Sequence, residues 1–591
     1  MKQLMTGNEA IARGAWEVGV RFASAYPGTP STEILENITK YKEIKSEWAP
    51  NEKVALEAAA GASLGGVRSI ASMKHVGVNV AADPLFTFAY TGVNGGMVLI
   101  TADEPGQHSS QNEQDNRYYA LAAKLPMFEP ANSQESKDML VAAYTLSEEY
   151  DTPVLMRTTT RVCHSKSIVE CGEQLEVYVR PYQKNPQKYL MVPAHAKVRR
   201  AAVEQRMQNL TDYSENTSYN HIEKGGKTGV ITSGMCYHYA KEVFGENATY
   251  LKLGFTNPLP ENLLSRFYSM VDDVYVIEEN DPYLENWVKS CSYACKGKDT
   301  FPAFGEMTPD VIRFAITGER FRAPEYDWNL VVPRPPTLCA GCPHRGLFYE
   351  LAKRKNVVIT GDIGCYTLGF ADPYNAMDTC ICMGSAFSVG HGMQQAFDVS
   401  GQKLRAVGIL GDSTFFHTGI NSLIEVLYND SRIICIILDN RITGMTGHQE
   451  NPGSGKHAAG DPALAMDIGT IVRSIGIKNV IEVNPNDIKA VRLSLDEAMA
   501  KDEPTVIITK WPCILKKMDQ VERELYGNPF TKKFFVDSGK CIGCKLCVRS
   551  GCPAISINQE TGKAGIDKPQ CVGCEICSQI CPKQAIIKEA V

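Results

Sequence analysis

Two cysteine-rich segments near the end of the sequence have the spacing of iron–sulfur ligands. They read CIGCKLCVRSGCP from residue 541 and CVGCEICSQICP from residue 571. In each segment, three cysteines at two-residue intervals can bind one cubane cluster from a single loop, and the cysteine before the proline reaches the cluster of the other half. The sequence therefore predicts two 4Fe-4S clusters, with the ligand sets Cys541, Cys544, Cys547, Cys581 and Cys571, Cys574, Cys577, Cys552.

Zinc is the alternative metal for these segments, because Cys-x-x-Cys is also a zinc spacing. A zinc ion takes only four ligands, however, which leaves the third cysteine of each triplet unexplained. One feature departs from the pattern of bacterial ferredoxins, since four residues and not three separate Cys547 from Cys552. We expect this additional residue to alter the local loop but not the ligand assignment.

A second group of candidate residues lies in one βαβ unit of the third quarter. An apolar run at 405–410 precedes Gly-Asp-Ser-Thr, a helix-like stretch follows at 417–428, and a β-branched run at 432–438 ends in Asp-Asn. A right-handed crossover makes the two strands parallel, so Asp412 and Asn440 both emerge at carboxyl ends, where α/β sheets bind ligands. Carboxylate and amide oxygens suit Mg²⁺, which usually carries a diphosphate.

This spacing resembles the diphosphate-binding motif of thiamine diphosphate enzymes, which also uses a backbone carbonyl two residues after the asparagine. The resemblance implies that Gly411, Asp412, Ser413, Asn440 and Ile442 bind the cofactor, with Asp412, Asn440 and the carbonyl of Ile442 on the metal. Ser413 stands where the motif usually has glycine. The alternative is that Asp and Asn are ordinary turn residues or helix caps at strand ends.

The resemblance extends over nearly the whole chain. The continuation NRITGMTGHQ is similar to the corresponding loop of the 2-oxoacid:ferredoxin oxidoreductases, and the similarity is greatest to the large subunits of the indolepyruvate:ferredoxin oxidoreductases. It is carried by YPGTPSTE, SSQNEQD, LCAGCPHR, GDIGCYTLG and GDSTFFHTG.

The resemblance also implies a third 4Fe-4S cluster, beside the thiamine ring. Members that carry this proximal cluster bind it with a Cys-x-x-Cys, a third cysteine about two dozen residues later and a distant one after the Mg²⁺ loop. The matching residues are Cys339, Cys342, Cys365 and Cys513. A redox dithiol, a zinc site or buried structural thiols are the alternatives. The other eight cysteines, including Cys380 and Cys382, are expected to be core thiols.

The amino-terminal half contains residues that the resemblance places at the active site. Thr29 matches a threonine near the substrate carboxylate, in a loop before a helix that Ser31 or Thr32 could cap. Thiamine activation needs a buried carboxylate on the aminopyrimidine ring. By resemblance this carboxylate is Glu57, although from spacing alone Glu52 competes.

A polar loop follows the strand-like segment 97–102. In the family this region lines the substrate pocket, which makes His108, Gln111 and Arg117 candidates for orienting a 2-oxoacid. Arginine can bind a carboxylate through two parallel hydrogen bonds. The alternative is that the loop is only a surface turn.

We expect an α/β protein with two doubly wound thiamine diphosphate-binding-type domains, a transketolase C-terminal-like α/β domain and a C-terminal two-cluster ferredoxin-like α+β domain. At 591 residues the chain is too long for one core. The predicted boundaries are a pyrimidine-binding domain at 1–185, the transketolase-like domain at 190–325, a thiamine diphosphate-binding domain at 330–515, a linker at 516–534 and the ferredoxin-like domain at 535–591.

Composition narrows the partners and the location. A formal net charge of −6 without a block of basic residues argues against nucleic acid as a partner. No apolar run approaches the length of a bilayer span, and 20 cysteines, several of them in metal-ligand spacings, suit a reducing compartment. We therefore expect a cytoplasmic protein that does not bind membranes.

The implied reaction converts indolepyruvate or another arylpyruvate, coenzyme A and oxidised ferredoxin to the aryl-acetyl-CoA, CO₂ and reduced ferredoxin. The cofactors would be thiamine diphosphate, Mg²⁺ and three 4Fe-4S clusters. The family also implies a small (beta) subunit, in a heterotetramer of two large and two small chains. Two other functions remain possible, namely a non-oxidative thiamine-dependent decarboxylase and a non-catalytic iron–sulfur electron-transfer subunit.

Overall fold

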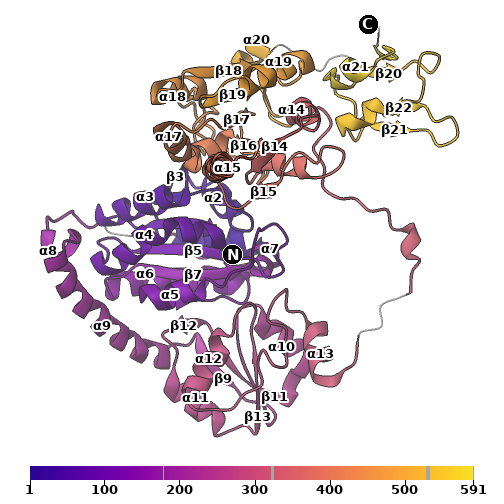
Figure 1. The fold of residues 1–591 in the computed structure, drawn as a ribbon. Helices are drawn as coiled ribbons and strands as arrows, with labels where there is room; N and C mark the ends of the chain where they lie inside the picture. Colours follow the sequence, from indigo (N-terminus) through magenta and orange to yellow (C-terminus); the bar gives the residue numbers. More distant parts are fainter. Residues whose placement is uncertain (177–178, 321–324, 527–532, 590–591) are drawn as a thin grey trace. The chain divides into compact units, whose positions relative to one another are not determined.

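The computed structural model describes residues 1–176, 179–320, 325–526 and 533–589. The chain divides into two compact units, one of Met1–Tyr326 with Ala458–Gly460 and one of Asp327–His457 with Asp461–Val591. No helix of the described residues is long and apolar enough to cross a membrane. Figure 1 shows both units, coloured along the sequence.

A seven-stranded sheet forms the centre of the first unit, in the order β12-β6-β7-β5-β4-β2-β3. All neighbours are parallel except β12, which runs antiparallel to β6. The middle strands are buried along their whole length, as expected for a parallel sheet covered on both faces. The strands are β2 (Phe22–Ala25), β3 (Lys45–Trp48), β4 (Ser69–Lys74), β5 (Met97–Asp103), β6 (Met127–Phe128), β7 (Val154–Thr159) and β12 (Phe255–Asn257).

Helices cover both faces of this sheet, because alternate side chains of each strand point to opposite cores. Met97 and Leu99 of β5 pack with α3 and α4, whereas Val98 and Ile100 pack with α1 and α6. The helices are α1 (Gly7–Glu17), α2 (Thr32–Ile38), α3 (Glu52–Leu64), α4 (His75–Thr91), α5 (Arg117–Ala123), α6 (Ser133–Glu149) and α7 (Thr160–His164). Strands β1 (Lys2–Thr6) and β8 (Lys166–Glu170) form a separate antiparallel pair.

The segment predicted as a transketolase-like domain forms a four-stranded sheet in the order β13-β10-β11-β9, with β9 antiparallel. Its strands are β9 (Asn220–Glu223), β10 (Thr228–Ser233), β11 (Ala248–Leu253) and β13 (Asp273–Ile277). The associated helices are α8 (Pro186–Tyr189), α9 (Pro193–Asn216), α10 (Cys236–Phe244), η1 (Gly245–Asn247), α11 (Glu261–Tyr268), α12 (Tyr283–Ser290) and α13 (Pro309–Thr317).

This segment is not separate from the first sheet. Strand β12 belongs to the first sheet although it follows β11 in sequence, and Ile231 and Leu251 share a core with Leu56 and Leu99. The two segments therefore form one unit with a common core.

A six-stranded parallel sheet forms the centre of the second unit, in the order β15-β14-β16-β17-β19-β18. The expected βαβ unit is present, with β16 and β17 as parallel neighbours. Its strands are β14 (Val357–Gly361), β15 (Thr379–Cys380), β16 (Arg405–Gly411), β17 (Ile434–Asp439), β18 (Asn479–Val483) and β19 (Thr505–Lys510).

One predicted helix of this unit is interrupted in the structure. The expected helix at 417–428 is divided into α16 (Asp412–Thr414), a π-helical turn η4 (Phe415–Gly419) and α17 (Ile420–Tyr428). The others are η2 (Trp328–Leu330), α14 (His344–Leu351), η3 (Cys365–Phe370), α15 (Ala386–Ser400), α18 (Ile468–Ile475), α19 (Ile488–Met499) and α20 (Gln520–Tyr526). Helix α20 lies in the segment predicted as a linker.

The cysteine-rich tail forms two small antiparallel ladders. Strand β20 (Phe534–Val536) pairs with β23 (Ile586–Lys588), and β21 (Ile555–Ile557) pairs with β22 (Ala564–Ile566). The helical turns η5 (Leu546–Ser550) and α21 (Ile576–Ile580) each contain the third cysteine of one triplet, Cys547 and Cys577.

Candidate active site and iron–sulfur centres

The carboxyl ends of β16 and β17 bring the predicted diphosphate-binding residues to one edge of the sheet. Gly411 is paired with Leu438 in the ladder, so Asp412 and Asn440 each follow at the end of a neighbouring strand. Asp412 is buried, and one of its oxygens accepts a hydrogen bond from the N–H of Ser413 at 2.8 Å. Burial, together with the nearby Asp439, raises the pKa of Asp412 to about 7.

These residues are suited to hold a cation. The Oδ1 atom of Asn440 accepts from the N–H of Ile442 at 3.2 Å, which stabilises a turn of the chain directly after β17. The Ser413 hydroxyl accepts from Thr443 at 3.0 Å, so serine in place of glycine anchors the same loop. A carboxylate, an amide oxygen and a backbone carbonyl are oxygen donors of the kind that Mg²⁺ prefers.

Two residues that sequence reasoning missed complete this edge. Asn451 donates to Asp412 Oδ2 at 3.3 Å from a loop 39 residues later. Asp362, after β14, is fully buried and accepts from the N–H groups of Gly384 and Ala386 at 2.9 and 3.1 Å. Burial raises the pKa of Asp362 to about 6. The sequence does contain a signal for Asp362, because Gly361-Asp362 follows an apolar strand in the same way as Gly411-Asp412 does.

Helix α3 of the first unit carries both candidate activating carboxylates, in different environments. Glu52 lies in the first turn after the N-cap residue Asn51 and is 7% exposed. A Cβ added to Gly77 of α4 would lie 2.6 Å from Glu52 Cγ, so the two helices pack closely at this point. The side chain of Glu57 is 47% exposed and forms an ion pair with Lys53 at 3.0 Å. The structure therefore buries Glu52 and not Glu57.

Thr29 lies in the loop between β2 and α2, at the carboxyl end of a strand, and is partly buried. The expected cap of α2 is absent, because Ser31 makes no side-chain capping bond. Instead, the Ser31 hydroxyl donates to the carbonyl of Gly28 at 2.8 Å, and Thr32 Oγ1 accepts from the N–H of Gly28 at 2.9 Å. Both side chains stabilise the turn that presents Thr29.

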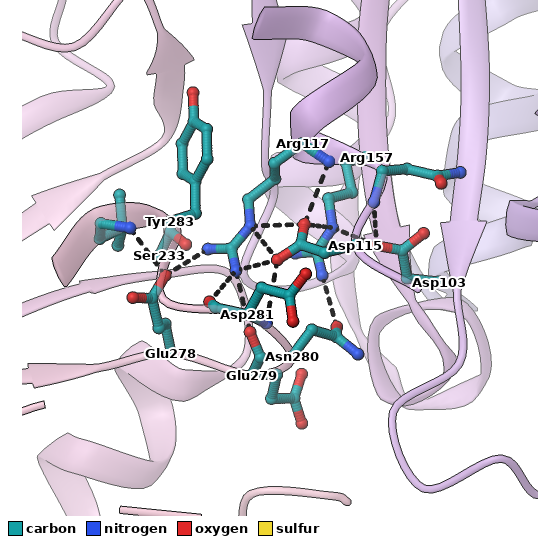
Figure 2. Close-up of polar contacts among 12 residues, drawn as sticks. Asp103, Asp115, Arg117, Arg157, Ser233, Glu278, Glu279, Asn280, Asp281 and Tyr283 are labelled. Carbon is teal, nitrogen blue, oxygen red and sulfur yellow. Dashed lines mark hydrogen bonds and ion pairs between the residues drawn. The ribbon is translucent and has the colours of Figure 1, made fainter. Parts of the chain in front are cut away.

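The three candidate substrate residues of the polar loop are not equivalent. His108 is half exposed, with its Nε2 atom 3.7 Å from Glu306, and Gln111 is exposed. Arg117 is 1% exposed, and its guanidinium donates to Asp115 at 2.9 Å and to Glu278 at 2.7 Å (Figure 2). These bonds occupy the groups that would bind a substrate carboxylate, so the arrangement does not support that role for Arg117.

Arg117 belongs instead to a buried polar network with Arg157. Arg157 donates to Asp103 at 2.6 Å, to Glu129 at 2.8 Å and to Asn280 at 2.8 Å. Figure 2 shows how the two guanidinium groups link the ends of β5 and β7 to the loop after β13. The network thus ties the four-stranded sheet to the seven-stranded sheet.

Each predicted cysteine quartet of the tail surrounds its own cavity. One cavity is lined by Cys541, Cys544, Cys547 and Cys581, and the other by Cys552, Cys571, Cys574 and Cys577. Four cysteines around one cavity fit a cubane cluster, in which each thiolate binds a different iron.

The third quartet also converges, although its members come from three loops. Burial raises the pKa of the Cys365 thiol to about 11, and the neighbouring Cys513 and Cys339 add to the rise. Cys342 is likewise close to Cys365 and Cys513. The N–H of Cys513 donates to the carbonyl of Asn440 at 2.9 Å, which joins this quartet to the diphosphate-binding loop.

Three family models match separate parts of the chain. The family "Pyruvate flavodoxin/ferredoxin oxidoreductase, thiamine diP-bdg" matches residues 13–228. "Thiamine pyrophosphate enzyme, C-terminal TPP binding domain" matches 362–509, and "4Fe-4S dicluster domain" matches 533–587.

The full chain also has relatives. "Indolepyruvate oxidoreductase subunit IorA" of Archaeoglobus fulgidus is 39% identical over 99% of this chain and 97% of its own. The proteins of the same name from Methanothermobacter thermautotrophicus and Pyrococcus horikoshii are 40% and 36% identical, over 100% and 99% of this chain and 97% of each relative. The chain belongs to this family of indolepyruvate oxidoreductase subunits. It is therefore one chain of a thiamine diphosphate-type oxidoreductase with a 4Fe-4S dicluster domain.

One expectation about the remaining cysteines of this family member is wrong. Cys163, Cys236 and Cys435 are buried, as expected for core thiols, but Cys380 and Cys382 are exposed. They lie at and just after β15, which is an edge strand of the six-stranded sheet among the described residues.

Proposed function

We propose that this subunit carries the catalytic centre of an indolepyruvate:ferredoxin oxidoreductase that acts on arylpyruvates and transfers the acyl group to coenzyme A. The observation that carries the proposal is the bond between Cys513 and Asn440. It places a cluster-ligand candidate next to the loop that would hold the cofactor diphosphate. Electrons released at the cofactor would then have a short path to iron.

The residues of the second unit would hold the cofactor. Asp412, Asn440 and the Ile442 carbonyl would bind Mg²⁺ and through it the diphosphate. Binding of the cation requires Asp412 to lose its proton, and the cation would reverse the effect of burial on its pKa. Thiamine diphosphate, when bound, supplies the carbon nucleophile for addition to the 2-oxo group and loss of CO₂.

A carboxylate of α3 would hold and accept a proton at the aminopyrimidine. The resemblance assigns this role to Glu57, whereas burial supports Glu52, because a buried carboxylate exchanges protons with a ring and not with water. We therefore favour Glu52. Thr29, His108 and Gln111 remain candidates for orienting the substrate.

The clusters bound by the three cysteine quartets would pass electrons in a defined order. The Cys571 quartet is Cys552, Cys571, Cys574 and Cys577, and the Cys541 quartet is Cys541, Cys544, Cys547 and Cys581. The cavity of the Cys571 quartet is also lined by Ala340 and Gly341, which lie between Cys339 and Cys342. This contact supports the order proximal cluster, then the Cys571 cluster, then the Cys541 cluster. Cys544 is exposed, as suits the exit to a soluble ferredoxin.

The family implies a small subunit, which we propose to complete a heterotetramer of two large and two small chains. In this proposal the four-stranded sheet, which corresponds to the predicted transketolase C-terminal-like domain, has an architectural role. Hydrogen bonds from Arg117 and Arg157 to Glu278 and Asn280 join this sheet to the seven-stranded sheet.

One anaerobic assay tests the function. The purified complex with its small subunit is mixed with indolepyruvate, and viologen reduction is followed with and without coenzyme A and thiamine diphosphate. We expect reduction that requires both compounds. Release of an aldehyde without viologen reduction would instead indicate a non-oxidative decarboxylase, and no turnover by a fully iron-loaded complex would indicate a non-catalytic electron-transfer subunit.

A further inference from the structure

Arg345 is a fully buried cation in the first turn of α14. It is 1% exposed, and its Nε atom donates to the backbone oxygen of Cys339 at 2.8 Å. Its Nη1 atom donates to the Tyr374 hydroxyl at 3.0 Å and to the backbone oxygen of Ser550 at 3.1 Å. Its Nη2 atom donates to the backbone oxygen of Leu338. All of these partners are uncharged.

Such a group requires a counter-charge. A guanidinium stays protonated in proteins, and a buried charge without an opposite charge is strongly destabilising. Among the residues that the structure describes, no carboxylate forms an ion pair with Arg345, whereas the buried Arg117 is paired with two carboxylates and the buried Arg157 with three. An anion of another kind must lie close to Arg345.

The ligand loops of two different quartets flank Arg345. On one side, its backbone N–H donates to the carbonyl of Cys342 at 3.3 Å and its Nε atom bonds to the carbonyl of Cys339, and both cysteines belong to the proximal quartet. On the other side, its Nη1 atom bonds to the carbonyl of Ser550, two residues before Cys552 of the Cys571 quartet. When the cysteines of a quartet bind a cluster they are thiolates, and the cluster with its ligands is an anion.

We propose that Arg345 is the counter-charge shared by the proximal cluster and the Cys571 cluster, and that it raises the reduction potentials of both. Each electron makes a cluster more negative, so a buried cation beside its ligand loops stabilises the reduced form. Arg345 is thus a positioning residue for electron transfer between the two clusters. The inference rests on the proposed function, which supplies the proximal cluster.

The additional residue between Cys547 and Cys552 supplies the tail's side of this contact. Ser550 ends η5, and Gly551 follows with a φ of 64°. A Cβ on Gly551 would lie 2.7 Å from the Tyr374 hydroxyl and 3.1 Å from Arg345 Nη1. Only glycine allows this close approach together with a positive φ, so the altered loop brings the Ser550 carbonyl onto the guanidinium.

The substitution Arg345→Met tests the charge, because methionine fills a similar volume without it. Redox titration of the complete anaerobic complex, followed by electron paramagnetic resonance, gives the midpoint potential of each cluster. We expect the midpoint potentials of the proximal cluster and the Cys571 cluster to fall by at least about 59 mV. This shift corresponds to a tenfold change in the equilibrium constant of a one-electron couple. The Cys541 cluster is the internal reference and should not shift.

The matched control is Tyr374→Phe, which removes a hydrogen bond from the same contact and leaves the charge in place. It should leave all three potentials within that tenfold limit. Unchanged potentials in Arg345→Met, or an equal shift of all three clusters, would overturn the inference, because a structural role alone predicts either result.

A variant that fails to incorporate iron is also informative. In that case Arg345→Lys, which keeps the charge, should restore all clusters with potentials near those of the unmodified protein. If the lysine variant also lacks iron, the hydrogen bonds and not the charge are essential, and the proposal is wrong. Iron content and spectra of the unmodified complex separately count its clusters. If only the two tail clusters are found, the proposed proximal cluster fails, and the Cys571 cluster alone still tests Arg345.

Discussion

Among single residues, burial distinguishes side chains that the sequence treats alike. Glu52 and Glu57 stand on one helix, five positions apart, and either could serve as an activating carboxylate. Asn51 caps that helix with its side chain on the N–H of Val54 at 2.9 Å, which sets the rotation at which Glu52 turns inward. Glu57 then lies toward solvent beside Lys53.

The first prediction concerns these two carboxylates. Glu52→Gln should lower the rate of indolepyruvate-dependent viologen reduction by about 10²–10⁴-fold, the usual contribution of a proton-transfer group, and Glu57→Gln should change it less than about threefold. Circular dichroism and iron content should remain normal in both. A large loss with Glu57→Gln alone would restore the assignment made by resemblance.

The second prediction concerns Glu279, in the buried network of Figure 2. Burial raises its pKa from 4.5 to about 7. Between these values the folded protein keeps a proton that the unfolded chain has lost, so Glu279 lowers the free energy of unfolding as the pH rises from about 4.5 to about 7. The full effect corresponds to about 3 kcal/mol.

The free energy of unfolding of Glu279→Gln, minus that of the unmodified protein, should therefore be larger at pH 8 than at pH 5. Thermal unfolding of the full chain at the two pH values measures this difference. Glu242→Gln, on the exposed side of α10, is the control and should show no such dependence. An identical effect of Glu279→Gln at both pH values would contradict the shifted pKa.

Among elements, the packing of α3 against α4 determines whether Glu52 keeps its place. Gly77 in the first turn of α4 has no side chain, and Glu52 occupies the space beside it. Gly61, in the interior of α3, has open space where a Cβ would be. The two glycines therefore form a matched pair for substitution.

The third prediction follows from this pair. Gly77→Ala should displace Glu52, destabilise the protein by about 1–3 kcal/mol and reduce activity, because overpacking forces side chains from their rotamers. Gly61→Ala should leave activity unchanged and stabilise the helix by up to about 1 kcal/mol. Equal activity of the two variants would show that the contact between Gly77 and Glu52 has no role in catalysis.

Within the second unit as a whole, the ferredoxin-like tail is held against the six-stranded domain by a small apolar cluster. Ile488 of α19 packs with Ile576 and Ile580 of α21. The Gln579 side chain accepts from the N–H of Ile488 at 3.0 Å and donates to the carbonyl of Asn486 at 2.7 Å. In the proposed order of clusters, this contact would maintain the separation between the proximal cluster and the tail.

The fourth prediction tests this contact. Ile576→Ala should cost about 2–5 kcal/mol in the cohesion of the tail, as for other buried isoleucines, and should slow reduction of ferredoxin more than loss of CO₂ from indolepyruvate. Stopped-flow measurement of both steps in the complete complex separates them. Leu525→Ala, at a position that is 72% exposed, is the control and should change neither step.

The sequence by itself determined the local features of this protein. The two tail quartets, the Asp412–Asn440 motif and the βαβ unit that carries them follow from spacing and apolar runs, because cluster ligands and neighbouring strand ends need only short-range geometry. The same applies to the family, whose motifs are continuous stretches of residues.

Tertiary structure decided everything that depends on remote partners. Arg117 pairs with Glu278, Cys513 bonds to Asn440, Glu52 packs beside Gly77, and Cys380 is exposed at a sheet edge. No local pattern contains these facts, since burial and charge pairing arise only when distant segments pack together. Arg345 is the clearest example. In the sequence it is one basic residue after a Cys-x-x-Cys, and only the fold encloses it between two cysteine quartets.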